Sequence, residues 1–206
     1  MQRDDAWLAL RAGKFTGSRF RELMARTKSG PSASRKNLIT RLAIERLIGA
    51  CVDTYCSPAM QRGTELEAEG RRAYEDAYLV AVELVDFVQH PTLDFVGVSP
   101  DGLVGTDGLV EIKAPSAEAK HYEALRYGAH ADEYRWQIQG QLWVTGRQWV
   151  DAVSYDPRFR GPDGDWSLAV KRVYRDEKAI SQLEAECIRA NDEIEAEVDW
   201  LRAKAE

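Results

Sequence analysis

The chain has 206 residues, of which 44% are hydrophobic and 30% are charged, a composition typical of a folded globular protein. This length suits one well-buried domain, so we expect residues 1–206 to form a single domain. No run of about 18 apolar residues occurs, which excludes a membrane-spanning helix. The acidic start of the chain lacks the apolar run of a secretory signal, so we expect a cytoplasmic protein with no membrane partner.

The first half of the chain places apolar residues mainly at helical spacing. Phe20, Leu23 and Met24, for example, share one face of a helix. The stretch 79–88 differs, because it is β-branched and almost continuously apolar, as in a buried strand. In chain order we expect a helix from Asp4 or Asp5 to Leu10, a helix that begins at Thr16 or Ser18, a loop at 29–35, helices at 36–49 and 61–77, and the strand at 79–88.

The second half mixes strands with helices. Alternating and β-branched residues predict strands, while three- and four-residue spacings predict helices. In chain order we expect strands near 94–98 and 108–113, helices at 117–127 and 131–145, strands at 148–155 and 167–174, and a last helix at 176–204. Helices therefore flank a central set of strands, and the sequence predicts a mixed α/β sheet with helices on its faces.

Charge is distributed unevenly along the chain. Residues 1–46 contain eleven Lys/Arg and four Asp/Glu, a balance of +7, while the remaining 160 residues contain 17 basic and 30 acidic residues, a balance of −13. Such asymmetry hints at a face that binds a polyanion, although most charged runs are simply solvated surface. Both interpretations stay open at the level of sequence.

Cysteine and histidine do not form a recognisable metal-binding pattern. The cysteines are too few for a tetrahedral zinc site or a four-cysteine cluster, so we expect reduced thiols with packing roles. The histidines show no paired spacing, and we expect them to be structural or surface residues. These residues are Cys51, Cys56, Cys187, His90, His121 and His130.

Two neighbouring segments, 99–102 (SPDG) and 109–113 (LVEIK), carry residues that can do chemistry. Side chains alternate faces along a strand, so Glu111 and Lys113 point the same way. Asp101 lies on the neighbouring strand or its turn and can meet Glu111 across the hairpin. Two adjacent carboxylates repel each other unless a cation lies between them, and Mg²⁺ prefers such oxygen ligands.

Lys113 beside such a cation can orient a water or hydroxide and offset negative charge on a phosphate, an arrangement that suits attack of water on a phosphodiester. The backbone carbonyl of Ile112 is a further candidate ligand. An ordinary solvated hairpin with a surface Glu/Lys pair also fits this short motif. The motif alone therefore does not decide between a catalytic site and a surface hairpin.

Four separated blocks extend the pattern beyond this hairpin. They are Trp7-Leu8-x-x-Arg11-x-Gly13-x-x-Thr16-x-Ser18, the helix from Gly63 through Glu67 to Tyr74, the segment 99–115, and Tyr134-x-x-Gln137-Ile138-Gln139 with its continuation to Arg158. In these blocks the chain resembles the lambda exonuclease, or YqaJ-like viral recombinase, family of the PD-(D/E)xK nuclease superfamily. The resemblance implies a restriction-endonuclease-like α/β core, in which helices flank a central mixed β-sheet.

The resemblance also implies roles for individual residues. Asp101 and Glu111 match magnesium-binding carboxylates, with the Ile112 carbonyl as a further ligand, and Lys113 matches the catalytic lysine. Glu67 matches a helix-borne carboxylate that supports a second metal ion or its waters. We therefore expect two Mg²⁺ ions, for which Mn²⁺ could substitute.

Further residues match positions that contact DNA. A pocket for the 5′-phosphate, in which arginine offers a charged fork and hydroxyls and an amide add neutral donors, is implied for Arg11, Ser18, Ser99 and Gln137. Other DNA contacts are implied for Lys28, Met60 and Tyr134, and Met60 occupies the place of an apolar wedge between the strands. Tyr134, Gln137 and Gln141 share one helical face, which could line the site or pack against the sheet edge. The stretch 90–99 is shorter than in lambda exonuclease, so whether Asp94 joins the site stays open.

By this resemblance the chain is expected to be a Mg²⁺-dependent deoxyribonuclease acting on linear double-stranded DNA. It would degrade one strand in the 5′→3′ direction from a 5′-phosphorylated end, release mononucleotides and leave 3′ single-stranded tails for recombination by single-strand annealing. The implied assembly is a ring-shaped homotrimer around DNA, and the implied partner is a phage-type single-strand annealing protein.

Three alternatives stay open at the level of sequence. They are an endonuclease on the same PD-(D/E)xK core, a DNA-binding recombination module without catalysis, and an acidic protein-interaction domain that docks through its final helix. A covalently closed circle distinguishes the first, because only an endonuclease cuts it. The intact set of Asp101, Glu111 and Lys113 argues against the second.

Overall fold

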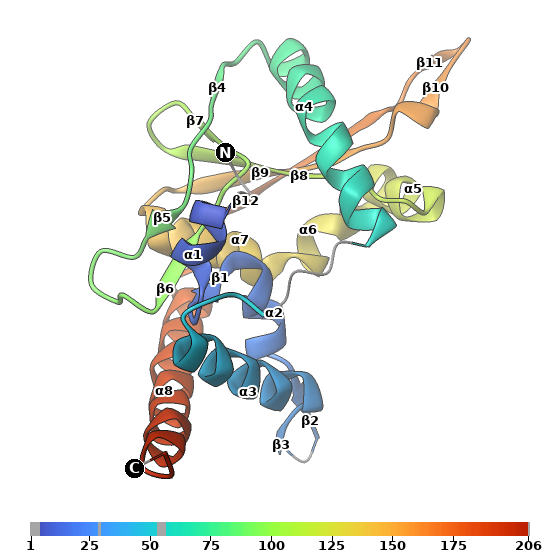
Figure 1. Cartoon of the computed structure of the whole chain (residues 1–206). Helices are drawn as coiled ribbons and strands as arrows, with labels where there is room; N and C mark the ends of the chain where they lie inside the picture. The colour runs from blue at the N-terminus through green and yellow to red at the C-terminus, as the bar shows by residue number, and fades with distance from the viewer. Residues whose placement is uncertain (1–4, 29, 53–56, 206) are drawn as a thin grey trace.

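A computed structural model describes residues 5–28, 30–52 and 57–205 of the chain (Figure 1). Its largest sheet has five strands in the order β12-β9-β8-β7-β4. Only the β8–β9 pair is parallel, and the other neighbours are antiparallel, so the sheet is mixed, as the sequence predicts. The strands are β4 (Val82–Glu83), β7 (Gly102–Val104), β8 (Gly108–Lys113), β9 (Trp149–Tyr155) and β12 (Leu168–Tyr174).

Helices cover both faces of this sheet because the central strands are apolar on both sides. On β8, Val110 and Ile112 face the long helix α4 (Pro58–Tyr78) and share a buried cluster with Tyr74. Leu109 faces the opposite way and packs in a cluster with Ile138 of α7 (Arg135–Thr145). The alternation of side chains along β8 therefore turns Glu111 toward α7.

A second layer packs beside the sheet and contains the largest hydrophobic cluster. Its small sheet has the order β1-β6-β5, with β1 (Phe15–Thr16) parallel to β6 (Val96–Val98) and β5 (Val88–Gln89) antiparallel to β6. Three helices contribute residues to the same cluster and contact one another: α2 (Phe20–Leu23), α3 (Ala33–Ile48) and α8 (Glu177–Arg202). Ser32 and Asp176 cap α3 and α8 by accepting backbone N–H groups of the first turn.

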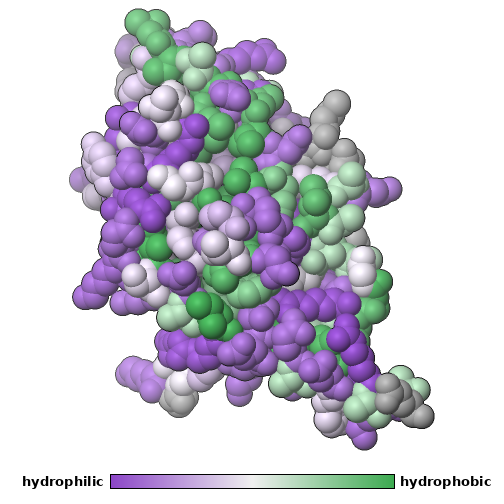
Figure 2. All heavy atoms as spheres, turned by 90° about the vertical axis from the view of Figure 1, so that its left-hand side faces the viewer, coloured by the Kyte–Doolittle hydropathy of each residue, from purple (hydrophilic) through white to green (hydrophobic). Residues whose placement is uncertain are grey.

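The remaining elements are short and connect these layers. They are α1 (Asp5–Arg11), η1 (Gly17–Arg19), β2 (Arg26–Thr27), β3 (Gly30–Pro31), α5 (Glu118–Tyr127), α6 (Ala129–Glu133), η2 (Pro157–Phe159), β10 (Arg160–Gly161) and β11 (Gly164–Asp165). Among the described residues no helix is long and apolar enough to cross a membrane. One face of the molecule is mostly hydrophilic, with only scattered hydrophobic areas (Figure 2).

Several predicted elements differ in the structure. Helix α3 begins at Ala33, inside the predicted loop 29–35, and β7 is a strand that the sequence did not predict. The strand predicted at 79–88 is wrong: Leu79 ends the preceding helix in a left-handed conformation and is 92% exposed, and the run divides into β4 and β5, which belong to different sheets. The helix predicted at 131–145 is interrupted at Tyr134, whose backbone (φ −100°, ψ 16°) leaves the helical region and separates α6 from α7.

The charge asymmetry also has a structural explanation. Several arginines of the basic N-terminal segment lie in ion pairs with glutamates, many of them on α8. Arg35, which is buried, bridges Glu186 at 2.7 Å and Glu193 at 2.8 Å, and Arg46 pairs with Glu195. Much of the N-terminal positive charge is therefore neutralised within the fold and does not by itself mark a polyanion-binding face.

Candidate active site

A cleft of about 1480 Å³ gathers most of the residues that the sequence singles out. Its walls come from α1, η1, α4, the β7–β8 hairpin, the loop after β8 and the α6–α7 junction. The predicted site residues that line it are Arg11, Ser18, Glu67, Asp101, Ile112, Lys113, Tyr134 and Gln137. Segments far apart in the sequence thus meet in one cavity.

Glu111 lies behind this cleft with its side chain 2% exposed. Both of its carboxylate oxygens accept hydrogen bonds. Oε1 accepts from Lys113 Nζ and from Gln137 Nε2 (2.5 Å), and Oε2 accepts from Gln141 Nε2 (2.5 Å). The helical face shared by Gln137 and Gln141 therefore lines the site. The sequence placed Gln141 with Gln137 on a helical face that could line the site or pack against the sheet edge, and its hydrogen bond to Glu111 favours the first interpretation.

Asp101 precedes β7 and meets β8 across the hairpin, as the sequence predicts. Its Oδ2 accepts a hydrogen bond from the backbone N–H of Ile112 at 2.7 Å. Burial raises the pKa of Asp101 well above its usual range, and the negative charges of Glu111 and Glu67 raise it further, while Lys113 opposes them. The three carboxylates therefore share one electrostatic environment, in which a cation would relieve their repulsion.

Lys113 ends β8 and points into the cleft beside Glu111. Burial alone would lower the pKa of Lys113, but the carboxylates of Glu111 and Asp101 outweigh that effect and the pKa is raised. The ammonium therefore stays protonated at neutral pH. The ring of Tyr134 lies 4.9 Å from its Nζ, a cation–π distance that holds the ammonium against the cleft wall.

The donor set fits a hard cation that is only partly ligated by protein. Among the described residues, no three His, Cys, Asp or Glu side chains converge closely enough to hold a metal ion unaided. Mg²⁺ does not require such a cage, because it commonly takes one or two carboxylates and completes its shell with waters and substrate phosphates. Asp101 and Glu111 are the carboxylates that would bind such a cation, and Ile112, which lines the cleft, would add its backbone carbonyl.

A second group of polar residues lies at the other end of the cleft. Arg11, at the end of α1, donates from Nη2 to Thr16 Oγ1 (3.0 Å) and to Ser18 Oγ (3.5 Å), and its guanidinium stacks on Trp7 at 4.1 Å. Trp7 in turn donates to Ser99 Oγ at 3.1 Å. Sequence reasoning quoted Trp7 and Thr16 in the motif but assigned them no role, whereas they hold Arg11 and Ser99 in place.

Gln137 connects the two ends of the cleft. Its side chain packs against Gly17: a Cβ added to Gly17 would lie 3.4 Å from the Gln137 Cγ. Its Nε2 donates a hydrogen bond to Glu111. Gly17 directly precedes Ser18, so one glutamine touches both the pocket around Arg11 and the acidic cluster. The implied phosphate pocket and metal site are therefore parts of one continuous surface.

A buried ion pair supports the pocket from behind. Glu45, which is fully buried, accepts from Arg19 at 2.6 Å and from the backbone N–H of Gly13 at 2.8 Å. Arg19 also donates to the carbonyl of Lys14. Gly13 has a φ of +68°, which favours glycine, so the turn after Arg11 is held by backbone conformation and by charge together.

Two of the residues considered from the sequence, Lys28 and Asp94, are not part of this arrangement. Lys28 lies exposed in the turn between β2 and β3, and it does not line the cleft. Asp94 is exposed in the loop before β6 and does not line it either. Met60 is in the first turn of α4, but its side chain lies outside the described part of the structure.

The histidines are structural, as the sequence predicts. All three are buried, and each uses ring nitrogens to fix neighbouring backbone or side chains. His90 Nδ1 accepts from the N–H of Leu93, His121 lies between Ser154 and the Trp166 carbonyl, and His130 bonds the Ala152 carbonyl. Cys51 and Cys187 are free thiols, in agreement with the expectation of reduced cysteines, while Cys56 lies outside the described residues.

Comparison with protein families decides the relationship. Residues 6–148 match the model of the YqaJ-like viral recombinase domain. The chain belongs to the YqaJ-like viral recombinase domain family. The matched range of this YqaJ-like chain contains every residue to which the sequence assigned a role in the site.

Solved structures agree with the YqaJ-like assignment. An alkaline exonuclease (LHK-Exo) from Laribacter hongkongensis is 42% identical, with a TM-score of 0.87 over 98% of each chain. LHK-Exo in complex with dAMP gives a TM-score of 0.88 at the same identity and coverage. A phage-related exonuclease from Haemophilus somnus 129PT shares the fold, with a TM-score of 0.72 and 15% identity over 91% of this chain and 96% of that chain. The comparison with curated proteins gave no match.

Proposed function

We propose that this YqaJ-like protein is a Mg²⁺-dependent exonuclease that degrades one strand of linear double-stranded DNA in the 5′→3′ direction. It starts at a 5′-phosphorylated end, releases mononucleotides and leaves 3′ single-stranded tails for recombination by single-strand annealing. The observation that carries this proposal is the single cleft in which Gln137 joins the Arg11 pocket to the acidic cluster.

The polar groups of the cleft suit the two ends of a nucleotide. A guanidinium with two neighbouring hydroxyls, as at Arg11 and Ser18, is a strong binder of a terminal phosphate. Holding that phosphate at one end places the next phosphodiester toward Asp101 and Lys113 at the other. Water then attacks that phosphorus, the P–O3′ bond breaks, and a 5′-mononucleotide leaves. LHK-Exo has been solved with dAMP, a deoxynucleoside monophosphate of the kind proposed as product.

Asp101 and Glu111, with the Ile112 carbonyl, would hold one Mg²⁺ ion, and Glu67 would support a second or its waters. Bound Mg²⁺ supplies positive charge to the scissile phosphate and makes water more acidic. The chain's own contribution is positioning: Gln137 and Gln141 fix both oxygens of Glu111, and Tyr134 fixes the ammonium of Lys113. The Lys113 ammonium, kept protonated by its carboxylate neighbours, orients water and offsets charge on the phosphate.

The proposed assembly is a homotrimer that encloses DNA, acting with a phage-type annealing protein as partner. Both proposals rest on the family relationship. Because much N-terminal charge is paired and buried inside the fold, a DNA-binding lining would depend on cations that line the cleft and stay exposed, such as Lys120 and Arg21, although both pair with Glu133. Light scattering of the purified protein tests the trimer directly, since a monomer or dimer would contradict it.

The decisive experiment compares three DNA substrates in Mg²⁺: linear duplex with 5′-phosphate ends, the same duplex with 5′-hydroxyl ends, and a covalently closed circle. The proposal predicts fast release of mononucleotides from the first, slow release from the second and no cleavage of the third. Equal rates on the two linear substrates would contradict the phosphate pocket. Cutting of the circle would instead indicate an endonuclease.

A further inference from the structure

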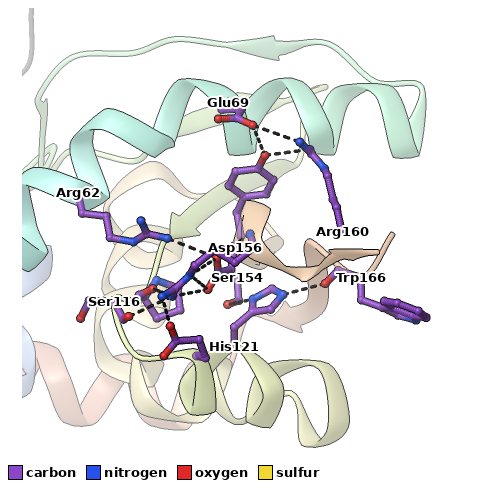
Figure 3. A network of polar contacts seen from close by, with 12 residues as sticks. Arg62, Glu69, Ser116, His121, Ser154, Asp156, Arg160 and Trp166 are labelled. Atoms are coloured by element: carbon purple, nitrogen blue, oxygen red, sulfur yellow. Dashed lines mark hydrogen bonds and ion pairs between the residues drawn. The ribbon is translucent and has the colours of Figure 1, made fainter. Parts of the chain in front are cut away.

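Asp156 directly follows β9 and is completely buried, although it is an aspartate outside the cleft lining. It lies where three parts of the chain meet: helix α4, the loop 114–117 after β8, and the one-turn helix η2 (Figure 3). Its backbone N–H is fixed by the Ser167 carbonyl at 2.9 Å. A buried carboxylate at such a junction is stable only if several donors satisfy it.

Two arginines provide these donors. Arg158 gives its backbone N–H (3.1 Å), its Nε (2.9 Å) and its Nη2 (2.6 Å) to the Asp156 carboxylate. Arg62 of α4 reaches the same carboxylate with Nη2 at 3.3 Å. Burial would raise the pKa of Asp156, but the hydrogen bonds and charge of Arg158, together with Arg62, lower it below its usual value. The carboxylate is therefore ionised at all pH values near neutrality.

Arg158 also forms hydrogen bonds with the loop that follows Lys113. Its Nη2 donates to the carbonyl of Ser116 at 3.0 Å and to that of Pro115 at 3.4 Å, and its Nη1 pairs with Glu118 in the first turn of α5. Residues 114–117 line the cleft immediately after Lys113. Through Arg158, Asp156 therefore fixes the main chain of residues 115–116, which directly follows the end of β8.

Arg62 makes the corresponding link to α4. Glu67 lies five residues further along the same helix and lines the cleft, so a displacement of α4 near Arg62 displaces Glu67 as well. The residue before Asp156 makes a second contact with α4, because the Tyr155 hydroxyl donates to Glu69 of that helix at 2.5 Å (Figure 3). The end of β9 and the residue that follows it thus hold α4 at two points, Arg62 and Glu69.

We propose that Asp156 is a positioning residue, which sets the distance between Glu67 on α4 and Lys113 at the end of β8 by holding Arg62 and Arg158 together. This inference rests on the proposed function, because it assigns Asp156 to the geometry of the same metal site. Residues that hydrogen-bond directly to metal ligands commonly change metal affinity by about 10- to 100-fold when they are altered. Asp156 acts on the ligands one step removed, through Arg62 and Arg158, so an effect of about tenfold is expected.

The test compares Asp156→Asn with Asp165→Asn as a matched control. Asp165 is exposed in the β10–β11 hairpin, where it pairs with Arg160 and accepts from Ser167, but it contacts neither α4 nor the loop 114–117. Two quantities are measured for each folded protein: the Mg²⁺ concentration that gives half-maximal hydrolysis, and the affinity for Mn²⁺ by calorimetry without DNA. Circular dichroism verifies the fold.

Asp156→Asn is expected to raise the half-maximal Mg²⁺ concentration by about tenfold or more and to weaken Mn²⁺ binding in parallel, while saturating metal restores most of the rate. Asp165→Asn is expected to match the wild type. If Asp156→Asn does not fold, Arg62→Gln, which cuts only the α4 arm, is expected to shift both quantities in the same direction by a smaller factor. A folded Asp156→Asn or Arg62→Gln with wild-type metal dependence would overturn the proposal.

The calorimetric measurement separates this inference from the proposed function. A wild-type protein that binds Mn²⁺ but does not hydrolyse DNA would overturn the function, while the comparison of Mn²⁺ affinities would still decide whether Asp156 positions the metal ligands. A purely structural role would lower the melting temperature of Asp156→Asn and leave its metal affinity unchanged, which would contradict positioning.

Discussion

Two regions of the molecule treat buried charge in opposite ways. Between α3 and α8, the buried guanidinium of Arg35 lies between Glu186 and Glu193. Its pKa is raised, with the hydrogen bonds that it donates to Glu193 the largest cause, although burial opposes the shift. At the cleft, burial and the charges of Glu111 and Glu67 raise the pKa of Asp101, so its ionised form is disfavoured. The fold stabilises the charge in the first region and destabilises it in the second.

This difference distinguishes ion pairs that stabilise the fold from charged residues that can bind a ligand. The α3–α8 ion pairs are complete within the protein, whereas at the cleft Asp101 and Glu111 lie close together beside Lys113 and the pKa of Asp101 stays raised despite that lysine. An excess of one sign in a sheltered space favours a missing counter-charge, here a cation. The number of charged residues in a segment therefore says less about function than the way in which they are paired.

The largest effect is expected for Asp101→Asn. The change removes a carboxylate from the metal site, so DNA hydrolysis in Mg²⁺ should fall by at least about 10²-fold. It also removes a like charge from the cluster, so the metal-free protein should become more stable at neutral pH. Urea unfolding in EDTA and hydrolysis in Mg²⁺ measure the two effects. A less stable Asp101→Asn protein would contradict the account of the cleft as an electrostatically strained site.

Arg35→Ala should do the opposite: it should lower stability and leave DNA hydrolysis unchanged. The substitution leaves Glu186 buried and poorly compensated, and the expected loss of unfolding free energy is about 3 kcal/mol. This value is at the low end for a broken buried pair, because Arg26 and Arg189 still contact Glu186. Hydrolysis per folded molecule should not change. Arg189→Ala, at the exposed end of the same group, is the control and should cost less than about 1 kcal/mol.

Arg11→Gln tests the second end of the cleft. Loss of a charged donor to the terminal phosphate should slow hydrolysis of 5′-phosphorylated duplex by roughly 10- to 100-fold, and hydrolysis from 5′-hydroxyl ends should be nearly unaffected. The ratio of the two rates is the informative quantity. Equal slowing on both substrates would assign Arg11 a structural role instead of phosphate binding.

The smallest effect concerns the stability of the protein at mildly acid pH. Burial lowers the pKa values of His90 and His130, with Glu184 opposing the shift of His90 and the Ala152 carbonyl opposing that of His130. As the pH falls below the ordinary histidine pKa of about 6.5, the unfolded chain therefore takes up protons before the folded one, and stability decreases. His90→Asn, which keeps an acceptor for the Leu93 N–H, should reduce this pH dependence in urea unfolding between pH 7 and pH 5. An unchanged slope would contradict the role of His90.

The central chemistry could be predicted from the sequence because it depends on local periodicity. Two-residue alternation correctly placed Glu111 and Lys113 on one face of β8, and four-residue spacing placed Gln137 and Gln141 on one face of a helix. Asp101 was correctly expected to meet β8 across a hairpin, but the strand that pairs with β8 is β7, which the sequence did not predict, and the strand predicted near 94–98 belongs to the small sheet. Each of these inferences needs only the geometry of one element or one hairpin.

The features that the sequence did not reveal depend on distant contacts. An apolar run such as 79–88 does not show that its two ends join different sheets or that Leu79 turns outward. The break at Tyr134 has no glycine or proline to mark it. The pairing of Arg35 with α8 joins residues about 150 positions apart. The sequence therefore could not show that much of the N-terminal positive charge forms ion pairs within the fold.

The central claim is that the cleft around Lys113 hydrolyses DNA, and one measurement tests it most directly. Mononucleotide release from 5′-phosphorylated linear duplex is measured in Mg²⁺ for the wild type, for Lys113→Ala, and for Lys36→Ala, which alters an exposed lysine on α3. The account predicts equal rates for the wild type and Lys36→Ala, and a loss of at least about 10²-fold for a folded Lys113→Ala. Full activity of Lys113→Ala would contradict it.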